Sequence, residues 1–289
     1  MNLLTAIVPI YKMSGRLEDL KQWVCESVKL DIHVILIHDF GDTETETELQ
    51  DFVKRQNSLN ITFISGNYGG PGLARNAAMH LIRTEYFCFW DSDDFPLVQS
   101  FHSMVLYAAE NKVEIAVGGY KAEKDKLLEH KKFAETTHEL INQVALNPGI
   151  WRMAFQSQRF TRERFRNLRL AEDQLFLVDL DFPEQKLIPY SEVVYQYSLE
   201  SPNSLTKQRV NLIDIPKSIV IIREKLTSVK STPSRDFLLA LWFRQSLTIL
   251  KLGNFGLKHQ GVRNLLAILL KSSLQEKVSL VKFIIGLRR

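Results

Sequence analysis

The fold is indicated first by residues 87–96, FCFWDSDDFP. An apolar aromatic run ends there in three carboxylates within four positions. The run predicts a buried strand that a proline closes. Charges clustered at such a strand end cost several kcal/mol unless a cation compensates them. In an extended chain, Asp91 and Asp93 point to one face, and Ser92 and Asp94 to the other. A hard divalent cation, Mg²⁺ or Mn²⁺, suits these carboxylates; the alternative is a solvated acidic turn.

The rest of the chain alternates apolar runs with segments of helical spacing. Strands are predicted at residues 3–11, 32–38, 61–65, 86–90, 114–118 and 193–198. Helices are predicted at residues 17–28, 44–56, 73–82, 100–111 and 139–146, and a helical turn at 171–177. Residues 120–137 are charged and predicted to be mobile. The alternation predicts a doubly wound α/β sheet, in which ligands bind beyond the carboxyl ends of the strands.

Three polar features are expected together at that edge of the sheet. Asp39 follows the second predicted strand, the glycine-rich loop 67–72 follows the third, and Asp91 and Asp93 follow the fourth. Three such features at one edge favour a binding site over solvated turns.

The charge is divided unevenly along the chain. Residues 216–289 hold 14 Lys and Arg against 3 Asp and Glu, a balance of +11, whereas residues 1–215 hold 23 against 30, a balance of −7. We therefore predict a catalytic domain at residues 1–215 and a basic, amphipathic helical region at 216–289, broken at residues 253–256. The basic region indicates an anionic partner.

Five motifs occur in order and with ordinary spacing. They are IVPIY (7–11), IHDFGD (37–42), GPGLARNAA (70–78), WDSDD (90–94) and AEDQLFL (171–177). Together they resemble the family 2 glycosyltransferases, which are nucleotide-sugar-dependent enzymes with a GT-A fold. The fold class expected is therefore α/β: a GT-A type, Rossmann-like, mixed and mostly parallel sheet flanked by helices, with a C-terminal helical appendage.

The resemblance implies a nucleotide-sugar site. Asp39 takes the position of a uracil-contacting acid, although the usual second acid of that turn is Phe40 here. Arg75 is expected to face the nucleotide or its diphosphate, or else to lie on a helix surface. The residues that complete the implied nucleotide-sugar site are Pro9, Tyr11, Gly70, Ser92 and Trp151, and Gly70 and Gly72 allow close backbone approach. Asn76 and Trp151 are equally compatible with packing roles, and Lys207 and Arg209 are candidates for closing over the diphosphate.

The same resemblance implies a separate role for each of the acids. Asp93 is the expected direct metal ligand, and Asp91 contacts the metal through water or contacts the ribose, so the implied cofactor is Mn²⁺ or Mg²⁺. Asp94 is expected to support these two acids without binding the metal directly. Asp173 is the expected catalytic base, with Glu172 orienting the acceptor or the base. The alternative for this pair is an acidic helix N-terminus that the helix dipole favours.

The function implied is inverting, metal-dependent transfer of one hexosyl or N-acetylhexosaminyl unit in surface polysaccharide synthesis. The donor is a nucleotide-diphosphate sugar, UDP-linked by family default with GDP and dTDP open, and the acceptor is a glycan or a lipid-linked glycan. A Gln-x-x-Arg-Trp motif of processive members is absent from the sequence. The alternatives are an inactive nucleotide-sugar-binding or scaffold subunit and a nucleotidyltransferase, although residues 9–13 supply no phosphate loop.

Partners and location follow from the basic region. No nucleic acid is expected, because no aromatic interleaving accompanies the basic residues. The C-terminal helices are expected to pack on the catalytic domain or on a second subunit as a homodimer, or to lie on an anionic membrane surface. The first residues lack a basic leader and no apolar run reaches about 18 residues, which predicts a cytoplasmic protein, peripheral at the inner face of the membrane.

Overall fold

The computed structural model describes residues 3–124, 127–130, 136–198 and 212–287. These residues form two compact units. One holds the β-sheet and its covering helices; the other is helical and is built from residues 136–149 and 168–185 together with the described residues from 212 on. The division into a catalytic domain at residues 1–215 and a helical region at 216–289 stays a prediction.

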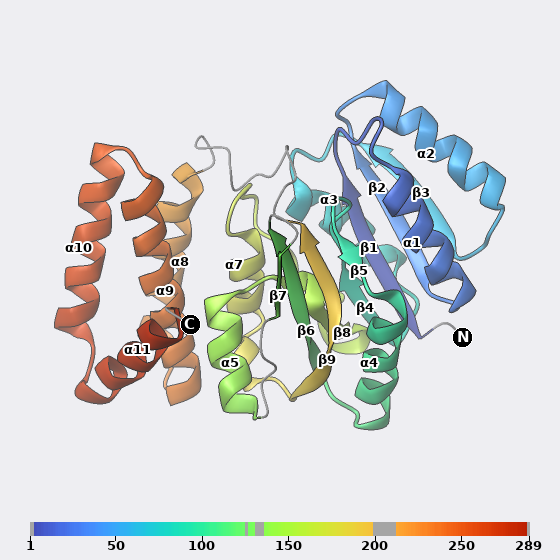
Figure 1. The fold of residues 1–289 in the computed structure, drawn as a ribbon. Coiled ribbons are helices and arrows are strands. Elements are labelled where there is room, and N and C mark those ends of the chain that lie inside the picture. The colour runs from blue at the N-terminus through green and yellow to red at the C-terminus, as the bar shows by residue number, and fades with distance from the viewer. Residues whose placement is uncertain (1–2, 125–126, 131–135, 199–211, 288–289) are drawn as a thin grey trace. The chain divides into compact units, whose positions relative to one another are not determined.

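The described strands form one nine-stranded sheet (Figure 1). They are β1 (Leu4–Ile10), β2 (His33–Asp39), β3 (Ile61–Gly66), β4 (Tyr86–Phe89), β5 (Phe95–Pro96), β6 (Ile115–Lys124), β7 (Leu127–His130), β8 (Met153–Gln156) and β9 (Leu187–Ser198). The order is β3-β2-β1-β4-β8-β6-β9-β5, with β7 on β6. The first four strands pair in parallel, so their carboxyl ends share one edge, as predicted.

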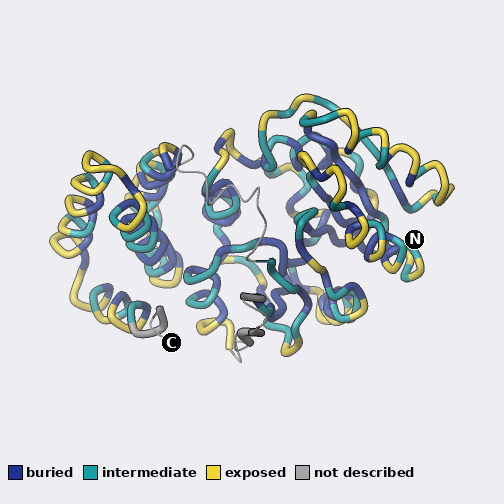
Figure 2. The backbone as a smooth tube through the Cα atoms, turned by 45° about the horizontal axis from the view of Figure 1, so that its top comes forward, coloured by how far each residue is buried: buried dark blue, intermediate teal, exposed yellow. Residues whose placement is uncertain are grey.

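Helices cover both faces of the parallel part of this sheet. They are α1 (Glu18–Lys29), α2 (Thr43–Gln56), α3 (Pro71–Ala78) with the 3₁₀ turn η1 (Met79–Leu81), and α4 (Val98–Glu110); the short η2 (Ile150–Arg152) and α6 (Ser157–Phe160) flank β8. The apolar sides of α1, α2 and α4 share one buried core with alternate residues of β1, β2 and β4. Helix α3 packs on β1 and β2. Strands β1, β2 and β4 are therefore buried along nearly their whole length, and buried backbone is drawn dark blue in Figure 2. The predicted α/β class is confirmed.

Several sequence-based expectations are corrected. The fourth strand ends at Phe89, and Asp94 N donates to Asp91 O at 3.3 Å, so residues 91–94 form a turn. The expected alternation of Asp91 and Asp93 along an extended chain is therefore wrong. The segment predicted to be mobile, residues 120–137, contains the end of β6 and the whole of β7. These two strands pair with each other, which corrects the prediction for them. Strands β5, β7 and β8 were not predicted.

The helical unit is arranged around a long central helix. Its elements are α5 (Thr137–Leu146), α7 (Glu172–Asp179), the 3₁₀ turn η3 (Phe182–Glu184), α8 (Asp214–Ser228), α9 (Thr232–Leu252), α10 (Phe255–Lys271) and α11 (Leu274–Leu287). Helix α9 contacts α5, α8, α10, α11 and η3. The predicted break after α9 is confirmed, and Asn254 caps α10 by accepting from Leu257 N at 3.0 Å. Among the described residues, no helix combines the length and apolarity that crossing a bilayer requires.

A buried polar chain joins α7 to the C-terminal helices. Gln245 of α9 donates from Nε2 to Gln174 Oε1 at 2.8 Å, and its Oε1 accepts from Ser218 Oγ of α8 at 2.7 Å. Buried amides are costly when unpaired, so this chain specifies how the three helices pack. The position of α7 within this unit thus depends on the C-terminal helices.

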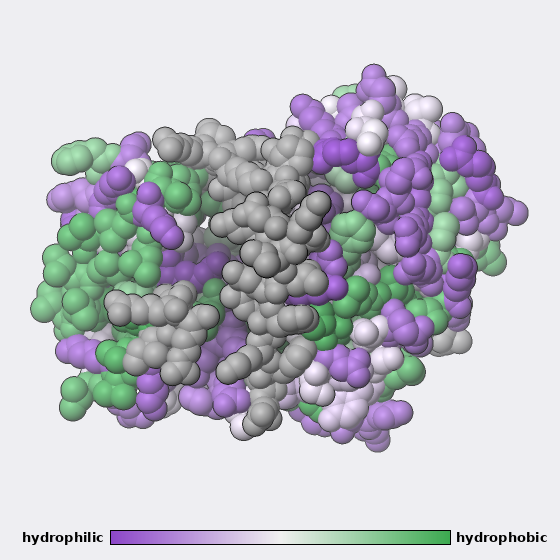
Figure 3. Space-filling model, viewed as in Figure 1, coloured by the Kyte–Doolittle hydropathy of each residue, from purple (hydrophilic) through white to green (hydrophobic). Residues whose placement is uncertain are grey.

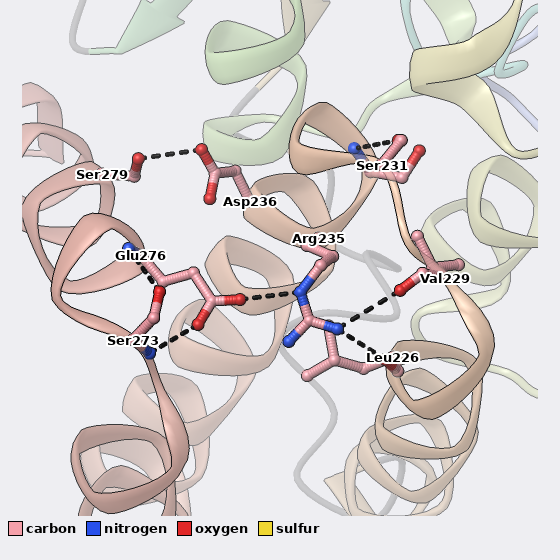
Figure 4. A network of polar contacts seen from close by, with 9 residues as sticks. Leu226, Val229, Ser231, Arg235, Asp236, Ser273, Glu276 and Ser279 are labelled. Atoms are coloured by element: carbon pink, nitrogen blue, oxygen red, sulfur yellow. Dashed lines mark hydrogen bonds and ion pairs between the residues drawn. The ribbon is translucent and has the colours of Figure 1, made fainter.

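An ion pair joins α9 to the start of α11 (Figure 4). Arg235 Nε donates to Glu276 Oε1 at 2.8 Å, and Arg235 Nη1 donates to the carbonyls of Leu226 and Val229 at 3.1 and 3.3 Å. Glu276 Oε2 accepts from Ser273 N at 2.7 Å. Burial alone would raise the pKa of the Glu276 carboxyl, but the hydrogen bonds from Ser273 and Arg235 outweigh it and lower this pKa.

We predict that Glu276→Gln lowers the free energy of unfolding by about 1–3 kcal/mol at pH 7, because it weakens bonds to a charged partner at a buried site. Because the pKa of Glu276 is lower in the folded state, its carboxylate stabilises the fold at pH values above the unfolded pKa. This stabilisation is lost as the pH falls through the folded pKa. The difference from the wild type should therefore shrink between about pH 5 and pH 3 in urea denaturation. Glu224→Gln, at an exposed position of α8, is the matched control. A difference independent of pH would contradict the role given to the carboxylate.

Candidate functional site

Asp39 organises the glycine-rich loop at the carboxyl edge of the sheet. Its Oδ1 accepts from the backbone N–H groups of Tyr68 and Gly69 at 2.7 and 3.0 Å, and its Oδ2 accepts from Gly70 N at 2.7 Å. Gly70 has φ of +150°, which favours glycine, and it precedes Pro71 at the start of α3. Asp39 therefore connects the end of β2 to the beginning of α3. The predicted contact of Asp39 with a base stays a prediction.

Arg75 of α3 lies in a buried setting and pairs with the acidic turn. Its Nη2 is 2.7 Å from Asp91 Oδ1, and the residue is only 2% exposed. The guanidinium lies 5.8 Å from the ring centroid of Phe89 and 5.3 Å from that of Phe165. Such cation–π contacts and a close carboxylate compensate a buried charge. Arg75 is thus no surface residue, and it holds Asp91 against α3.

Asn76 supports the same arrangement. Its Nδ2 donates to the carbonyl of Phe165 at 2.8 Å, and its Oδ1 accepts from Phe165 N at 2.8 Å. This paired contact positions the Phe165 ring beside Arg75. The packing role that the sequence left open for Asn76 is the one observed.

The acidic turn is anchored from β9. Asp91 N donates to Tyr195 Oη at 3.0 Å, and Asp94 Oδ1 accepts from Ser198 N at 2.8 Å. Asp94 is buried; this burial, with the nearby Asp91 and Asp93 charges adding to it, raises the pKa of its carboxyl well above the ordinary value. Ser92 and Asp93 are half-buried at the tip of the turn.

Other predicted donor-site residues occupy mixed environments. Pro9 lies near the end of β1, and Tyr11, just beyond it, is half exposed. Trp151 is buried and stacks on Tyr195, with ring centroids 4.6 Å apart and planes at 22°. Its observed contacts are therefore those of a packed aromatic cluster, whereas its predicted contact with the sugar stays a prediction.

The second acidic pair belongs to the helical unit. Glu172 and Asp173 form the first turn of α7, where the helix dipole favours negative charge. Glu172 is buried and Asp173 is half-buried. Ala171 before them has φ of +70°, a left-handed conformation that is uncommon for alanine. The roles of both acids stay predictions. Lys207 and Arg209 lie outside the described residues.

Sequence reasoning missed the residues that support the turn. Tyr195 and Ser198 of β9 hold its backbone and one carboxylate, and Phe165 covers Arg75. Tyr195 is far from the acidic motif in the sequence and lies in a strand with no motif of its own. No local pattern distinguishes it from an ordinary core tyrosine.

The acidic turn fits a divalent cation by the chemistry of its donors. The described residues hold no group of three or more His, Cys, Asp and Glu arranged to bind a metal. Mg²⁺ sites commonly use one or two carboxylates and complete the coordination with water and substrate phosphates. Asp91 Oδ1 is paired with Arg75 and Asp94 Oδ1 with Ser198, whereas Asp93 lies at the half-buried tip. Asp91 and Asp93 are the two acids that would hold the ion.

Known proteins resemble the chain along most of its length. It is 26% identical over 220 residues to "Uncharacterized glycosyltransferase EpsJ" of Bacillus subtilis (strain 168), covering 71% of this chain and 63% of the relative. It is 24% identical over 271 residues to the poly(ribitol-phosphate) beta-N-acetylglucosaminyltransferase TarS of Staphylococcus aureus (strain Mu50 / ATCC 700699), covering 88% and 46%. The chain thus spans less than two thirds of the length of these curated relatives.

Solved structures share the fold, and a family model matches the sequence. S. aureus TarS 1-349 in complex with UDP-GlcNAc aligns with a TM-score of 0.68 at 17% identity, covering 97% of this chain and 79% of that one. The mannosyltransferase PcManGT from Pyrobaculum calidifontis, in complex with GDP-Man and Mn²⁺, aligns with a TM-score of 0.62 at 14% identity, covering 96% and 78%. These likenesses confirm the expected GT-A fold. The model of Glycosyl transferase family 2 matches residues 5–170, and the chain belongs to this family.

Proposed function

We propose that the chain is an inverting, divalent-metal-dependent glycosyltransferase that moves one sugar from a nucleotide-diphosphate sugar to a glycan or lipid-linked glycan. The observation that carries this proposal is the line of contacts from Asp39 through Gly70 and α3 to Arg75 and Asp91. It joins three loops at the carboxyl ends of parallel strands, where ligands of such sheets bind. UDP is the nucleotide favoured, since a structural relative is in complex with UDP-GlcNAc.

The acidic turn is the proposed anchor of the donor diphosphate. Asp93 and Asp91 would hold Mn²⁺ or Mg²⁺, which when bound neutralises charge developing on the departing nucleoside diphosphate. Arg75 fixes Asp91 by their 2.7 Å contact. The loop held by Asp39 offers backbone approach to the nucleotide through Gly70. Pro9, Tyr11, Ser92 and Trp151 remain the proposed further donor contacts.

Asp173 is the proposed base. An inverting transfer requires a carboxylate that takes the proton of the acceptor hydroxyl as its oxygen attacks the anomeric carbon. Asp173 lies half-buried in the first turn of α7, and Glu172, buried beside it, would orient the acceptor or the base.

The acceptor class follows from the relatives. TarS is named for transfer of N-acetylglucosamine to poly(ribitol-phosphate), and another relative, from Bacillus spizizenii, is named a poly(ribitol-phosphate) beta-glucosyltransferase. We therefore assign this chain to hexosyl or N-acetylhexosaminyl transfer in surface polysaccharide synthesis.

The helical unit carries exposed apolar side chains, which support attachment to an anionic membrane at its cytoplasmic face. On α10, Phe255, Val262, Leu266, Leu269 and Leu270 recur at helical spacing and are exposed, Phe255 by 90%. Lys258 and Arg263 flank them. Figure 3 shows hydrophobic side chains gathered over this helix. An apolar stripe with basic edges suits the interface of an anionic bilayer, where each basic residue adds about 1 kcal/mol.

Asp93→Asn should weaken donor binding that depends on metal by at least about tenfold, because the substitution removes a charged metal ligand and changes even to groups that orient such ligands cost about 10–100-fold. Titrations of UDP sugars and GDP-mannose with Mn²⁺, with Mg²⁺ and with chelator measure this effect and also identify the donor. Asp51→Asn, at an exposed position of α2, should bind as the wild type does. Unchanged metal-dependent binding in Asp93→Asn would refute the anchor.

Asp173→Asn should retain donor binding and lower transfer by about 100- to 10,000-fold, since it removes a general base without changing side-chain size. The measurement compares the donor dissociation constant with the rate of sugar transfer. Asp179→Asn, at the other end of α7, is the control. Transfer at the wild-type rate would show that another group takes the proton.

Full-length protein carrying Leu266→Gln, Leu269→Gln and Phe255→Gln should lose most of its co-sedimentation with anionic vesicles, because the exposed stripe then holds amides. Leu59, which is 100% exposed in the sheet unit, provides the control Leu59→Gln. Wild-type binding should fall as salt rises. If both variants sediment with the vesicles equally, the stripe is not the contact; light scattering of the free protein then tests whether it joins two copies.

A further inference from the structure

The acidic turn at residues 91–94 is attached to β9 at both of its ends. At the first end, Asp91 N donates to Tyr195 Oη at 3.0 Å. At the last end, Asp94 Oδ1 accepts from Ser198 N at 2.8 Å. Each partner lies 104 positions further along the chain. Because β9 is a strand of the same sheet, these two bonds determine where the turn lies relative to β4, which precedes it.

The Tyr195 hydroxyl takes the place of a strand partner where the chain leaves the sheet. The parallel pairing of β4 with β1 extends to Trp90, whose N donates to Ile7 O at 3.1 Å. The next backbone donor, Asp91 N, goes to Tyr195 Oη instead. A backbone N–H at a buried strand end requires an acceptor. Tyr195 therefore supplies the bond at which the strand changes into the turn.

The position of this hydroxyl is itself fixed by packing. Tyr195 is 0% exposed, and its ring stacks on that of Trp151 with centroids 4.6 Å apart. A tyrosine hydroxyl that accepts one bond also has one proton to donate. Burial raises the pKa of the Asp94 carboxyl, and a hydrogen bond with the Tyr195 side chain is among the contacts that oppose this rise. One hydroxyl thus interacts with both ends of the turn.

The side chains at the tip of the turn are not used in this support. Asp91 Oδ1 is held by Arg75 at 2.7 Å, and Asp94 is buried. Ser92 and Asp93 make no side-chain hydrogen bond or ion pair with a described residue. The backbone of the turn is therefore fixed, while the Asp93 carboxylate stays at the half-buried tip. Binding to groups that are already in position costs less ordering entropy.

We propose that Tyr195 is a positioning residue whose hydroxyl holds the acidic turn in the shape that binds the cation. The inference rests on the proposed metal site and deepens it, because it assigns a function to a residue of β9. Tyr195 has no exposed surface, so it acts on the ion through Asp91 and not by contact. Replacing groups that orient metal ligands typically lowers metal affinity by about 10–100-fold.

Tyr195→Phe should keep the fold, because other contacts join the same segments. Strands β5 and β9 pair at Pro96 and Tyr195, and Leu97 N donates to Val194 O at 2.9 Å, and these are backbone contacts that do not involve the hydroxyl. The phenyl ring can still stack on Trp151. The substitution therefore removes the acceptor of Asp91 N and little else.

Calorimetric titration of UDP into the full-length protein at a series of Mn²⁺ concentrations tests the proposal without turnover. GDP is titrated in parallel, so the result does not depend on which nucleotide the protein prefers. In Tyr195→Phe, the Mn²⁺ concentration that gives half of the increase in nucleotide affinity should rise at least about tenfold. Nucleotide affinity in the presence of chelator should equal that of the wild type.

Tyr86→Phe is the matched control. Tyr86 is also 0% exposed in the sheet unit, and its Oη donates to Val113 O at 2.7 Å. It lies at the start of β4, at the opposite end of this strand from the turn. Tyr86→Phe should lower the unfolding temperature, because it also removes a buried hydrogen bond, but it should leave the Mn²⁺ dependence unchanged.

Thermal unfolding shows which variants are folded. A folded Tyr195→Phe with the Mn²⁺ dependence of the wild type overturns the positioning role, as does an equal shift in Tyr86→Phe. If Tyr195→Phe does not fold, Asp94→Ala decides, since it removes the acceptor of Ser198 N and should shift the Mn²⁺ dependence in the same direction. No shift in Asp94→Ala then overturns the proposal. Nucleotide binding by the wild type that is independent of Mn²⁺ would instead refute the proposed metal site, and the positioning role with it.

Discussion

The buried pair of Arg75 and Asp91 is the interaction on which the candidate donor site depends. A guanidinium that is 2% exposed would cost several kcal/mol without a carboxylate nearby, so the helix that carries Arg75 and the turn that carries Asp91 are placed together. Asp39 fixes the start of the same helix through three backbone N–H groups. One carboxylate of the acidic turn is thereby neutralised by the protein itself. Asp93, at the half-buried tip, is therefore the acid that we propose to bind a cation from solution.

The parallel half of the sheet was predictable because its signal is local. Strands β1, β2 and β4 are buried on both faces, so each reads as a nearly continuous apolar run, and the polar residues after them fall at one edge. Strands β5 and β8 have two and four residues and are held by partners distant in sequence, which no local pattern reveals. Strand β7 also has only four residues and pairs with β6, directly before it in the chain. The same limit applied to the site. The acids were found by their motif, but the support of their turn by Tyr195 and Ser198 depends on tertiary contacts.

The C-terminal helices have a structural role, which is one of the alternatives that their composition left open. Charge and amphipathicity suggested a basic appendage, and the structure shows that α8 and α9 hold α7 through Gln174, Gln245 and Ser218. The helix that begins with Glu172 and Asp173 is thus positioned by residues more than 40 positions further along the chain. Truncation before α8 would remove this support, so a loss of activity on truncation does not by itself identify a membrane function.

The apolar and basic features of the helical unit are explained better together than separately. Exposed leucines alone would promote association of copies, and basic residues alone would bind many anions. Here the exposed Lys271 follows Leu270 and precedes Leu274, so charge and exposed apolar surface adjoin at the end of α10. The interface of an anionic bilayer offers an apolar layer and negative charge at one depth, and it is therefore the partner that we propose for both features.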